Sequence, residues 1–163
     1  MNDDLTIRKV TKNDSELLFN WRNDDSARIF SRNSHLLTLA EHEEWFDKIL
    51  SSNASESVIY IVEDSRQRIG MTRIDKSSDD SAEISIILDP KFRGKGLSKH
   101  LLSMTLEIIA KNFSYKRIIA TIHQDNIASQ RAFKALGFKE LGQNLLFVTY
   151  QWFPSPESNT STV

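Results

Sequence analysis

The residues best suited to chemistry lie in one basic turn, Leu88-Asp89-Pro90-Lys91-Phe92-Arg93-Gly94-Lys95-Gly96-Leu97-Ser98. The glycines Gly94 and Gly96 let backbone N–H groups approach a ligand closely, and a helix beginning after Gly96 adds unpaired donors and a partial positive charge. Three basic side chains flank these glycines: Lys91, Arg93 and Lys95. The pattern predicts a phosphate-binding turn. An ordinary surface turn is the alternative, because the segment is neither a Walker loop nor a dinucleotide fingerprint.

A second segment, Asn126–Phe138, has a capping Asn, a short amphipathic stretch and a terminal Gly-Phe. With both segments in view, the chain resembles the GNAT family of acetyl-CoA-dependent N-acetyltransferases over about residues 5–152. The family signature Arg/Gln-x-x-Gly-x-Gly/Ala is matched by Arg93, Gly96 and Ser98, with Ser98 in place of Gly or Ala. The signature of an Asn-x-x-Ser followed by a helix ending in Gly-Phe is matched by Asn126, Ser129, Gly137 and Phe138.

The resemblance implies acetyl-CoA as co-substrate and a set of residues around it. The turn of Arg93, Gly94, Lys95, Gly96, Leu97 and Ser98 would hold the pyrophosphate. The strand residues Ile86, Ile87 and Leu88 would pair with the pantetheine arm, where this strand splays from 116–122. Asn126 would contact the arm from the other side. Arg131 and Lys134 would reach the 3′-phosphate, or else form a solvated helix face.

The family often places a Tyr seven residues after the Asn, as the acid for the departing thiolate. Here that residue is Phe133, which cannot donate a proton; at this position it would still contact the cofactor. A thiol has a pKa near about 8.5, so the thiolate leaves tolerably without an acid. Ser129 and Tyr150 are weaker substitutes for the acid.

An amine attacks only when it is neutral, so a base is useful. Glu83 is the first candidate, since relatives carry a carboxylate near this place that acts through water; a solvent-facing strand carboxylate is the alternative. His42 is a second candidate base, with a surface or hydrogen-bonded histidine as the alternative. A backbone N–H near Ile87 or Leu88 would meet the acetyl oxygen.

Two N-terminal segments bear on the acceptor, Trp21-Arg22-Asn23 and His42-x-x-Trp45. They resemble the acetyltransferases of pseudaminic acid biosynthesis, which modify the 4-amino group of a UDP-linked deoxy sugar. That resemblance implies a diphosphate held by Arg22, Arg28 and Arg32 and a ring stacked on Trp21 or Trp45. A tryptophan at helix spacing, such as Trp45, is more often a core residue than a stacking platform, and Trp21 has the same alternative. The acceptor could instead be a protein N-terminus or a small amine.

The composition and net charge of the chain exclude several other classes of protein. The chain has 163 residues, 39% of them hydrophobic, with a net charge of −1 and no Cys. These values exclude wholesale disorder, a generic polyanion binder such as a nucleic-acid protein, and a thiolate metal site. No apolar stretch approaches a membrane span, and His35, His100 and His123 have no metal-ligand spacing. We expect no metal, no membrane partner, a cytoplasmic location, and a monomer or homodimer.

The predicted elements must bring these residues together. Strands are expected at 5–10, 57–62, 68–75, 82–88, 116–122, 138–141 and 145–152, and helices at 15–21, 39–50, 97–109 and 126–136, with 27–37 a loop holding a possible short helix. This order predicts an α/β (α+β) fold with a mixed, largely antiparallel sheet of six to seven strands and helices on both faces. Residues 1–153 would form a single domain and 154–163 a frayed tail.

The predicted function is direct acetyl transfer in a ternary complex, without an acyl-enzyme. A non-catalytic acetyl-CoA-binding module is an alternative, motivated by Phe133. Another alternative is a domain that only binds other proteins and whose basic turn binds no cofactor.

Overall fold

A computed structural model describes residues 4–65 and 67–155, so most of the predicted tail lies outside the described residues. The strands are β1 (Leu5–Lys9), β2 (Ser57–Asp64), β3 (Gln67–Lys76), β4 (Ser81–Leu88), β5 (Arg117–His123), β6 (Lys139–Gln143) and β7 (Phe147–Trp152). The helices are α1 (Ser15–Asn23), α2 (Asp25–Ile29), α3 (Leu39–Ser51), α4 (Leu97–Asn112) and α5 (Ile127–Ala135), with single 3₁₀ turns at Lys12–Asp14 and Pro90–Phe92.

The strands form one seven-stranded sheet in the order β1-β2-β3-β4-β5-β7-β6. Neighbours are antiparallel except β4 and β5, which run parallel. The predicted fold class is confirmed, including the meander of β2, β3 and β4. The possible short helix of the expected loop is present as α2, which begins two residues before that loop; there Asp24 accepts a capping hydrogen bond from Ala27 N–H at 3.1 Å.

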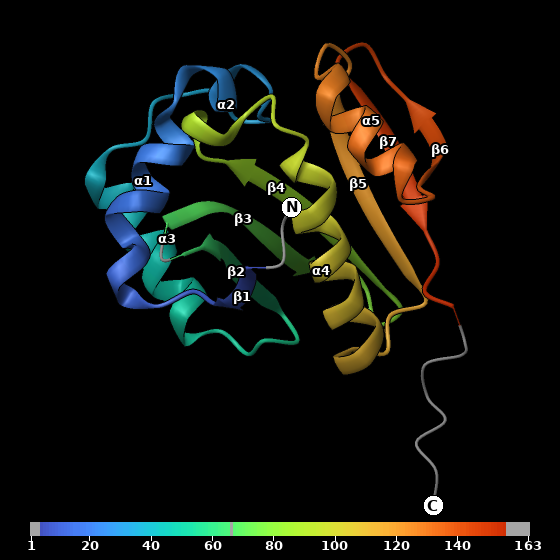
Figure 1. Cartoon of the computed structure of the whole chain (residues 1–163), viewed down its shortest axis with the longest axis horizontal. Coiled ribbons are helices and arrows are strands. Elements are labelled where there is room, and N and C mark those ends of the chain that lie inside the picture. The colour runs from blue at the N-terminus through green and yellow to red at the C-terminus, as the bar shows by residue number, and fades with distance from the viewer. Residues whose placement is uncertain (1–3, 66, 156–163) are drawn as a thin grey trace, which may run out of the picture.

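The β4–β5 ladder is short. It pairs Ser81, Ala82 and Glu83 with Arg117, Ile118 and Ile119, and no further. Beyond Glu83 the two strands diverge, and Figure 1 shows β5, β6, β7 and α5 set apart from β1–β4 above that point. The predicted splay is therefore present between these strands.

Helices cover both faces of the sheet (Figure 1). Side chains alternate along β4, so Ile84 and Ile86 pack with α4 and α5, whereas Ile87 packs with α1 and α3. Phe133 and Phe138 meet edge to face, with centroids 4.9 Å apart, in the core beneath α5. Glu83 and Ser85 share the parity of Ile87, so they face the α1–α3 side.

Local sequence explains where the helices begin. Thr38 and Glu41 form the predicted capping box at α3. Gly96 precedes α4 in the left-handed region, at φ 74°, and Asn126 caps α5. None of the helices in the described ranges has both the length and the apolar character needed to cross a bilayer.

Candidate active site

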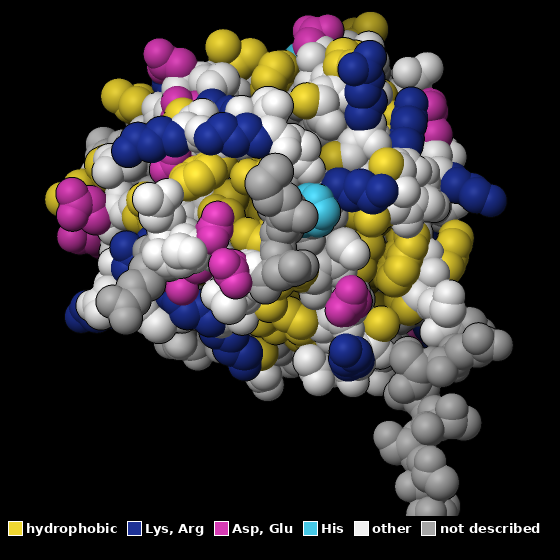
Figure 2. Space-filling view, viewed as in Figure 1, with side chains coloured by type: hydrophobic (Ala, Val, Ile, Leu, Met, Phe, Trp, Pro, Cys, Tyr) yellow, Lys and Arg dark blue, Asp and Glu magenta, His cyan; other side chains and the backbone are white. Residues whose placement is uncertain are grey.

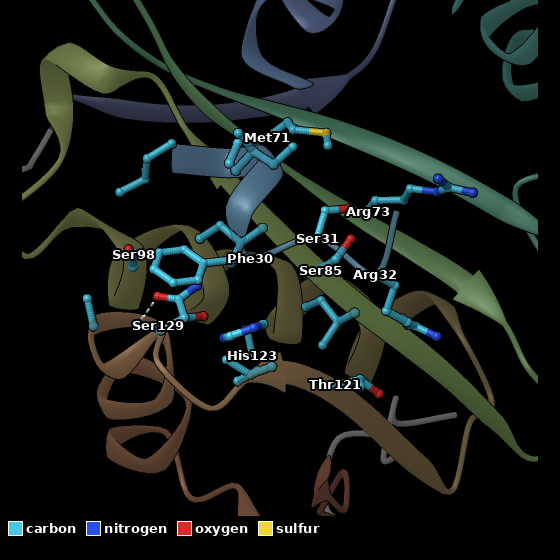
Figure 3. Close-up of a pocket in the computed structure, with 18 of the residues that line it drawn as sticks. Phe30, Ser31, Arg32, Met71, Arg73, Ser85, Ser98, Thr121, His123 and Ser129 are labelled. Atoms are coloured by element: carbon cyan, nitrogen blue, oxygen red, sulfur yellow. Dashed lines mark hydrogen bonds between the residues drawn. The ribbon is translucent and has the colours of Figure 1, made fainter. Parts of the chain in front are cut away.

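A cavity of about 490 Å³ occupies the gap between β4 and β5. In Figure 3, Ser98 and Ser129 lie at one end of it, Arg32 and Arg73 at the other, and Phe30 between them. The cavity therefore joins the predicted cofactor turn to the α1–α3 face. A volume of this size suits a small molecule.

The cofactor turn is shaped by its two glycines. Gly94 and Gly96 have φ values of 73° and 74°, which L side chains rarely adopt. A Cβ on either would meet nothing within 4 Å, so the backbone there faces open space. No side chain in the described chain caps α4. These features fit a bound pyrophosphate.

Basic side chains surround this turn. Figure 2 shows Lys and Arg side chains over the turn before α4 and over α5. The exposed ones are Lys91 and Lys95 on the turn, Lys99 in the first turn of α4, and Arg131 and Lys134 on α5. Lys95 Nζ lies 5.1 Å from the centroid of the Phe92 ring, and Lys134 Nζ lies 5.6 Å from that of Tyr150.

Arg93 holds the turn in place. Its guanidinium donates to Asp24 Oδ2 at 2.7 Å and to the Leu88 carbonyl at 3.1 Å. Burial alone would raise the pKa of Asp24, but hydrogen bonds from Arg93, Ser26 and Ala27 hold that pKa below its usual value. Arg93 lines the cavity, yet its charge is already paired, and Leu97 is buried in the core.

The free edge of β4 presents backbone groups to the gap. Asp89 N–H donates to Ile69 O on the β3 side at 2.8 Å, and backbone direction alternates along an antiparallel strand. The backbone groups of Ile86 and Leu88 therefore face the gap, and those of Ile87 face β3. Because the Ile87 N–H faces β3 and the Leu88 N–H faces the gap, the predicted donor to the acetyl oxygen narrows from Ile87 or Leu88 to Leu88. The Leu88 carbonyl already accepts from Arg93.

The α5 side of the cavity carries Asn126, Ser129 and Phe133. Asn126 Oδ1 accepts from Ser129 N–H at 3.2 Å, which orients the side chain, and no described residue accepts from its Nδ2, so both N–H donors are left for a ligand. The prediction of Tyr150 as a substitute acid is corrected. Tyr150 is 1% exposed, lies outside the cavity lining, and donates its hydroxyl hydrogen to Gln130 at 2.8 Å. Its hydroxyl secures α5 to β7, which leaves it no access to a thiolate.

The α1–α3 face of the cavity carries two carboxylates. Glu83 forms an ion pair with Arg32, which arrives from the segment after α2. Asp75 pairs with Arg73 at 2.8 Å and accepts from Ser57 at 2.6 Å. Arg22 and Trp45 line the same face.

Three predicted residues lie elsewhere. His42 is fully buried, outside the cavity lining, and its Nε2 is 3.1 Å from Ser15 Oγ; its ring stacks on Phe46 with centroids 5.7 Å apart. Trp21 is 2% exposed and donates to Asp89 at 2.9 Å. Arg28 pairs with Asp25 at 2.6 Å, away from the cavity. Packing makes His42 and Trp21 core residues, which corrects their predicted roles as base and stacking platform.

The cavity also includes residues that the sequence analysis missed: Phe30, Arg73, Asp75, Thr121 and His123. Phe30 and His123 are in ring contact at 5.6 Å, so the segment after α2 reaches across to β5. Alternation along β5, where Ile118, Ala120 and Ile122 are buried, is the signal that places Thr121 and His123 on the open face.

The sequence model of the acetyltransferase (GNAT) domain matches residues 4–139. The chain belongs to the GNAT acetyltransferase family. It is therefore an acyltransferase, and acetyl-CoA is its co-substrate. Among the described residues, no group of three or more His, Asp or Glu side chains is placed to hold a metal ion.

Two curated proteins are similar in sequence to this GNAT chain. It is 31% identical over 139 residues to an uncharacterized protein of Methanocaldococcus jannaschii, a match covering 83% of this chain but only 28% of that protein. It is 25% identical over 145 residues to the spermidine N(1)-acetyltransferase of Vibrio cholerae, covering 87% and 83% of the two chains.

Solved structures agree with the GNAT fold. A spermidine N-acetyltransferase from Vibrio cholerae, in complex with CoA and spermine, superposes with a TM-score of 0.85 at 21% identity over 94% of this chain and 97% of that one. A domain from Methanocaldococcus jannaschii superposes with a TM-score of 0.79 at 28% identity, over 91% and 97%.

Proposed function

We propose that this GNAT chain transfers acetyl from acetyl-CoA to a primary amine on a small molecule, by direct attack in a ternary complex. One observation carries the proposal: a single cavity is lined both by the cofactor turn, at Gly94 and Ser98, and by carboxylates on the opposite face, at Asp75 and Glu83. Both substrates can therefore meet inside one site. The predicted monomer or homodimer stays a prediction; a dodecameric structure is known for the Vibrio cholerae spermidine enzyme.

Each residue has a role in this proposal. Acetyl-CoA supplies the acetyl group as a thioester. The backbone of Gly94 and Gly96 holds its pyrophosphate, and the Leu88 N–H is the donor for the acetyl oxygen. Glu83 takes the proton from the incoming amine, because an amine of pKa near about 10.4 is almost wholly charged at neutral pH. An ammonium group that reaches Glu83 takes the place that Arg32 occupies.

The size of the cavity and the charged residues that line it limit which amines can be the acceptor. A cavity of about 490 Å³ favours a small amine over a folded protein terminus. A polyamine is one candidate, supported by the spermidine acetyltransferase relative and by the two carboxylates. The 4-amino group of a UDP-linked amino sugar is the other, supported by the arginines at the same end of the cavity.

The test is acetyl transfer by the full chain, followed by release of the CoA thiol and by the mass of the acceptor. Spermidine, an amine-bearing UDP-sugar and a peptide with a free N-terminus serve as acceptors. We expect multiple turnovers with one of the small amines and none with the peptide. Acetyl-CoA binding without acetylation of any amine would instead establish a non-catalytic binding module.

Glu83→Gln tests the base. We expect kcat to fall by about 100-fold or more, and to recover as the pH approaches the pKa of the amine, because the neutral amine then forms without help. Glu140→Gln, on exposed β6 outside the cavity, is the matched control. A Glu83→Gln enzyme with the parent's kcat and pH profile would remove Glu83 from the mechanism.

A further inference from the structure

The charges that line the cavity do not all balance. Four arginines and two carboxylates face it, namely Arg22, Arg32, Arg73, Arg93, Asp75 and Glu83. Three of the arginines have carboxylate partners: Arg32 has Glu83, Arg73 has Asp75, and Arg93 has Asp24. Within residues 4–65 and 67–155, Arg22 has neither an ion pair nor a hydrogen-bond acceptor. Its fork of N–H donors is therefore left for something outside the protein.

Arg22 is held rather than free to swing into solvent. It sits in the last turn of α1, and its Cζ lies 4.6 Å from the centroid of the Trp45 ring on α3. Arg73 Cζ lies 5.3 Å from the same centroid. Stacking on a ring orients a guanidinium plane while its N–H edge stays available. Two guanidinium groups thus meet around one indole at the acceptor end of the cavity.

The surroundings of Arg22 disfavour an unaccompanied charge. Burial, and then the positive charge of Arg73, lower the pKa of Arg22. A bound anion would offset both effects, and a fork of N–H donors matches the two oxygens of a carboxylate or phosphate. A second positive group at this place would add repulsion instead.

We propose that the acceptor carries an anionic group, a carboxylate or a phosphate, besides its amine, and that Arg22 on Trp45, with Arg73 beside it, binds that group. This inference rests on the proposed acetyl transfer for the amine end. The acceptor is then bipolar: its ammonium meets Glu83 and Asp75, and its anion meets Arg22. A purely cationic polyamine does not fit the Arg22 end.

Binding of simple anions tests the subsite independently of catalysis. The protein is first saturated with CoA, which fills the cofactor turn, and inorganic phosphate and succinate are then titrated separately by calorimetry. We expect one of the two to bind, and Arg22→Gln to weaken that binding at least about tenfold. Arg117→Gln is the matched control, because Arg117 lies at the far end of β5 outside the cavity. No binding of either anion, or equal binding by Arg22→Gln, overturns the proposal.

Kinetics with paired acceptors test what the subsite selects. Phosphoethanolamine is compared with ethanolamine, and β-alanine with its amide, alongside spermidine. We expect the parent to prefer one anionic member over its neutral partner at least about tenfold in kcat/KM, through KM, and Arg22→Gln to lose that preference. The pair that shows the effect tells phosphate from carboxylate.

The outcomes separate the two proposals. Faster turnover of spermidine than of every anionic acceptor overturns the anionic acceptor and leaves acetyl transfer intact. Arg22-dependent anion binding without acetylation of any amine supports the subsite and overturns the proposed function.

Discussion

His42 links folding to pH through its burial. It is fully buried, its Nδ1 has no hydrogen-bond partner among the described residues, and burial lowers its pKa below the usual 6.5. The unfolded chain therefore takes up a proton at His42 before the folded chain does. Its stabilising contribution is complete above about pH 6.5 and is lost as the pH falls below that value.

We predict that the parent loses stability between pH 7 and pH 5 by up to about 1.4 kcal/mol per pH unit from this residue. His42→Gln should flatten that dependence, as measured by urea unfolding at a series of pH values. His100→Gln changes an exposed histidine and is the control. A parent and a His42→Gln variant with parallel pH profiles would contradict the prediction.

The cofactor turn and the N-terminal cap of α5 could be predicted from the sequence, because local backbone geometry favours glycine at the turn and Asn at the cap. The roles of His42, Trp21 and Tyr150 were not, because each depends on a partner far along the chain. Tyr150 meets Gln130, and Trp21 meets Asp89. Arg73 was missed for the same reason: its stacking on Trp45 joins a strand to a helix.

Gly70 shows how closely elements approach one another. A Cβ at this position in β3 would lie 2.6 Å from the Ile87 carbonyl oxygen and 2.9 Å from Leu101 Cδ2 of α4. The carbonyl belongs to the neighbouring strand and cannot rotate away as a side chain would. Glycine is therefore required where β3, β4 and α4 meet.

We predict that Gly70→Ala lowers the free energy of unfolding by about 1–3 kcal/mol, as overpacking of a core does. The urea midpoint measures this. Gly142→Ala is the control, because a Cβ there meets nothing within 4 Å. Equal midpoints for the two variants would show that β3 and β4 can shift to accommodate a methyl group at Gly70 without loss of stability.

Most elements could be predicted from periodicity alone, and their bounds differ by a few residues. The alternation of β5 and the capping box of α3 are local signals, so both were found. The short helix α2 was only a possibility, because its five residues carry little pattern and its cap Asp24 is also a partner of Arg93. Strand order and the short β4–β5 ladder depend on the whole sheet.

At the scale of the molecule, acetyl-CoA that binds in the gap between β4 and β5 should stabilise the folded protein, because it binds the folded chain and not the unfolded one. We predict that acetyl-CoA at 100 times its Kd adds about 2.7 kcal/mol, which raises Tm by roughly 5–10 °C for a domain of this size. NAD and ATP are the controls in the same thermal scan. The lack of a shift at millimolar acetyl-CoA would contradict the assigned cofactor site.

The bond between Arg93 and Asp24 has a consequence for how the two substrates influence each other. Asp24 caps the helix that leads to Phe30 and Arg32, while Arg93 belongs to the cofactor turn. Arg93 also donates to Ser26 Oγ within α2, so an ion pair and a hydrogen bond join the cofactor turn to this helix. Coupling between two binding sites is reciprocal: whatever factor acetyl-CoA contributes to acceptor affinity through this contact, the acceptor must return to acetyl-CoA.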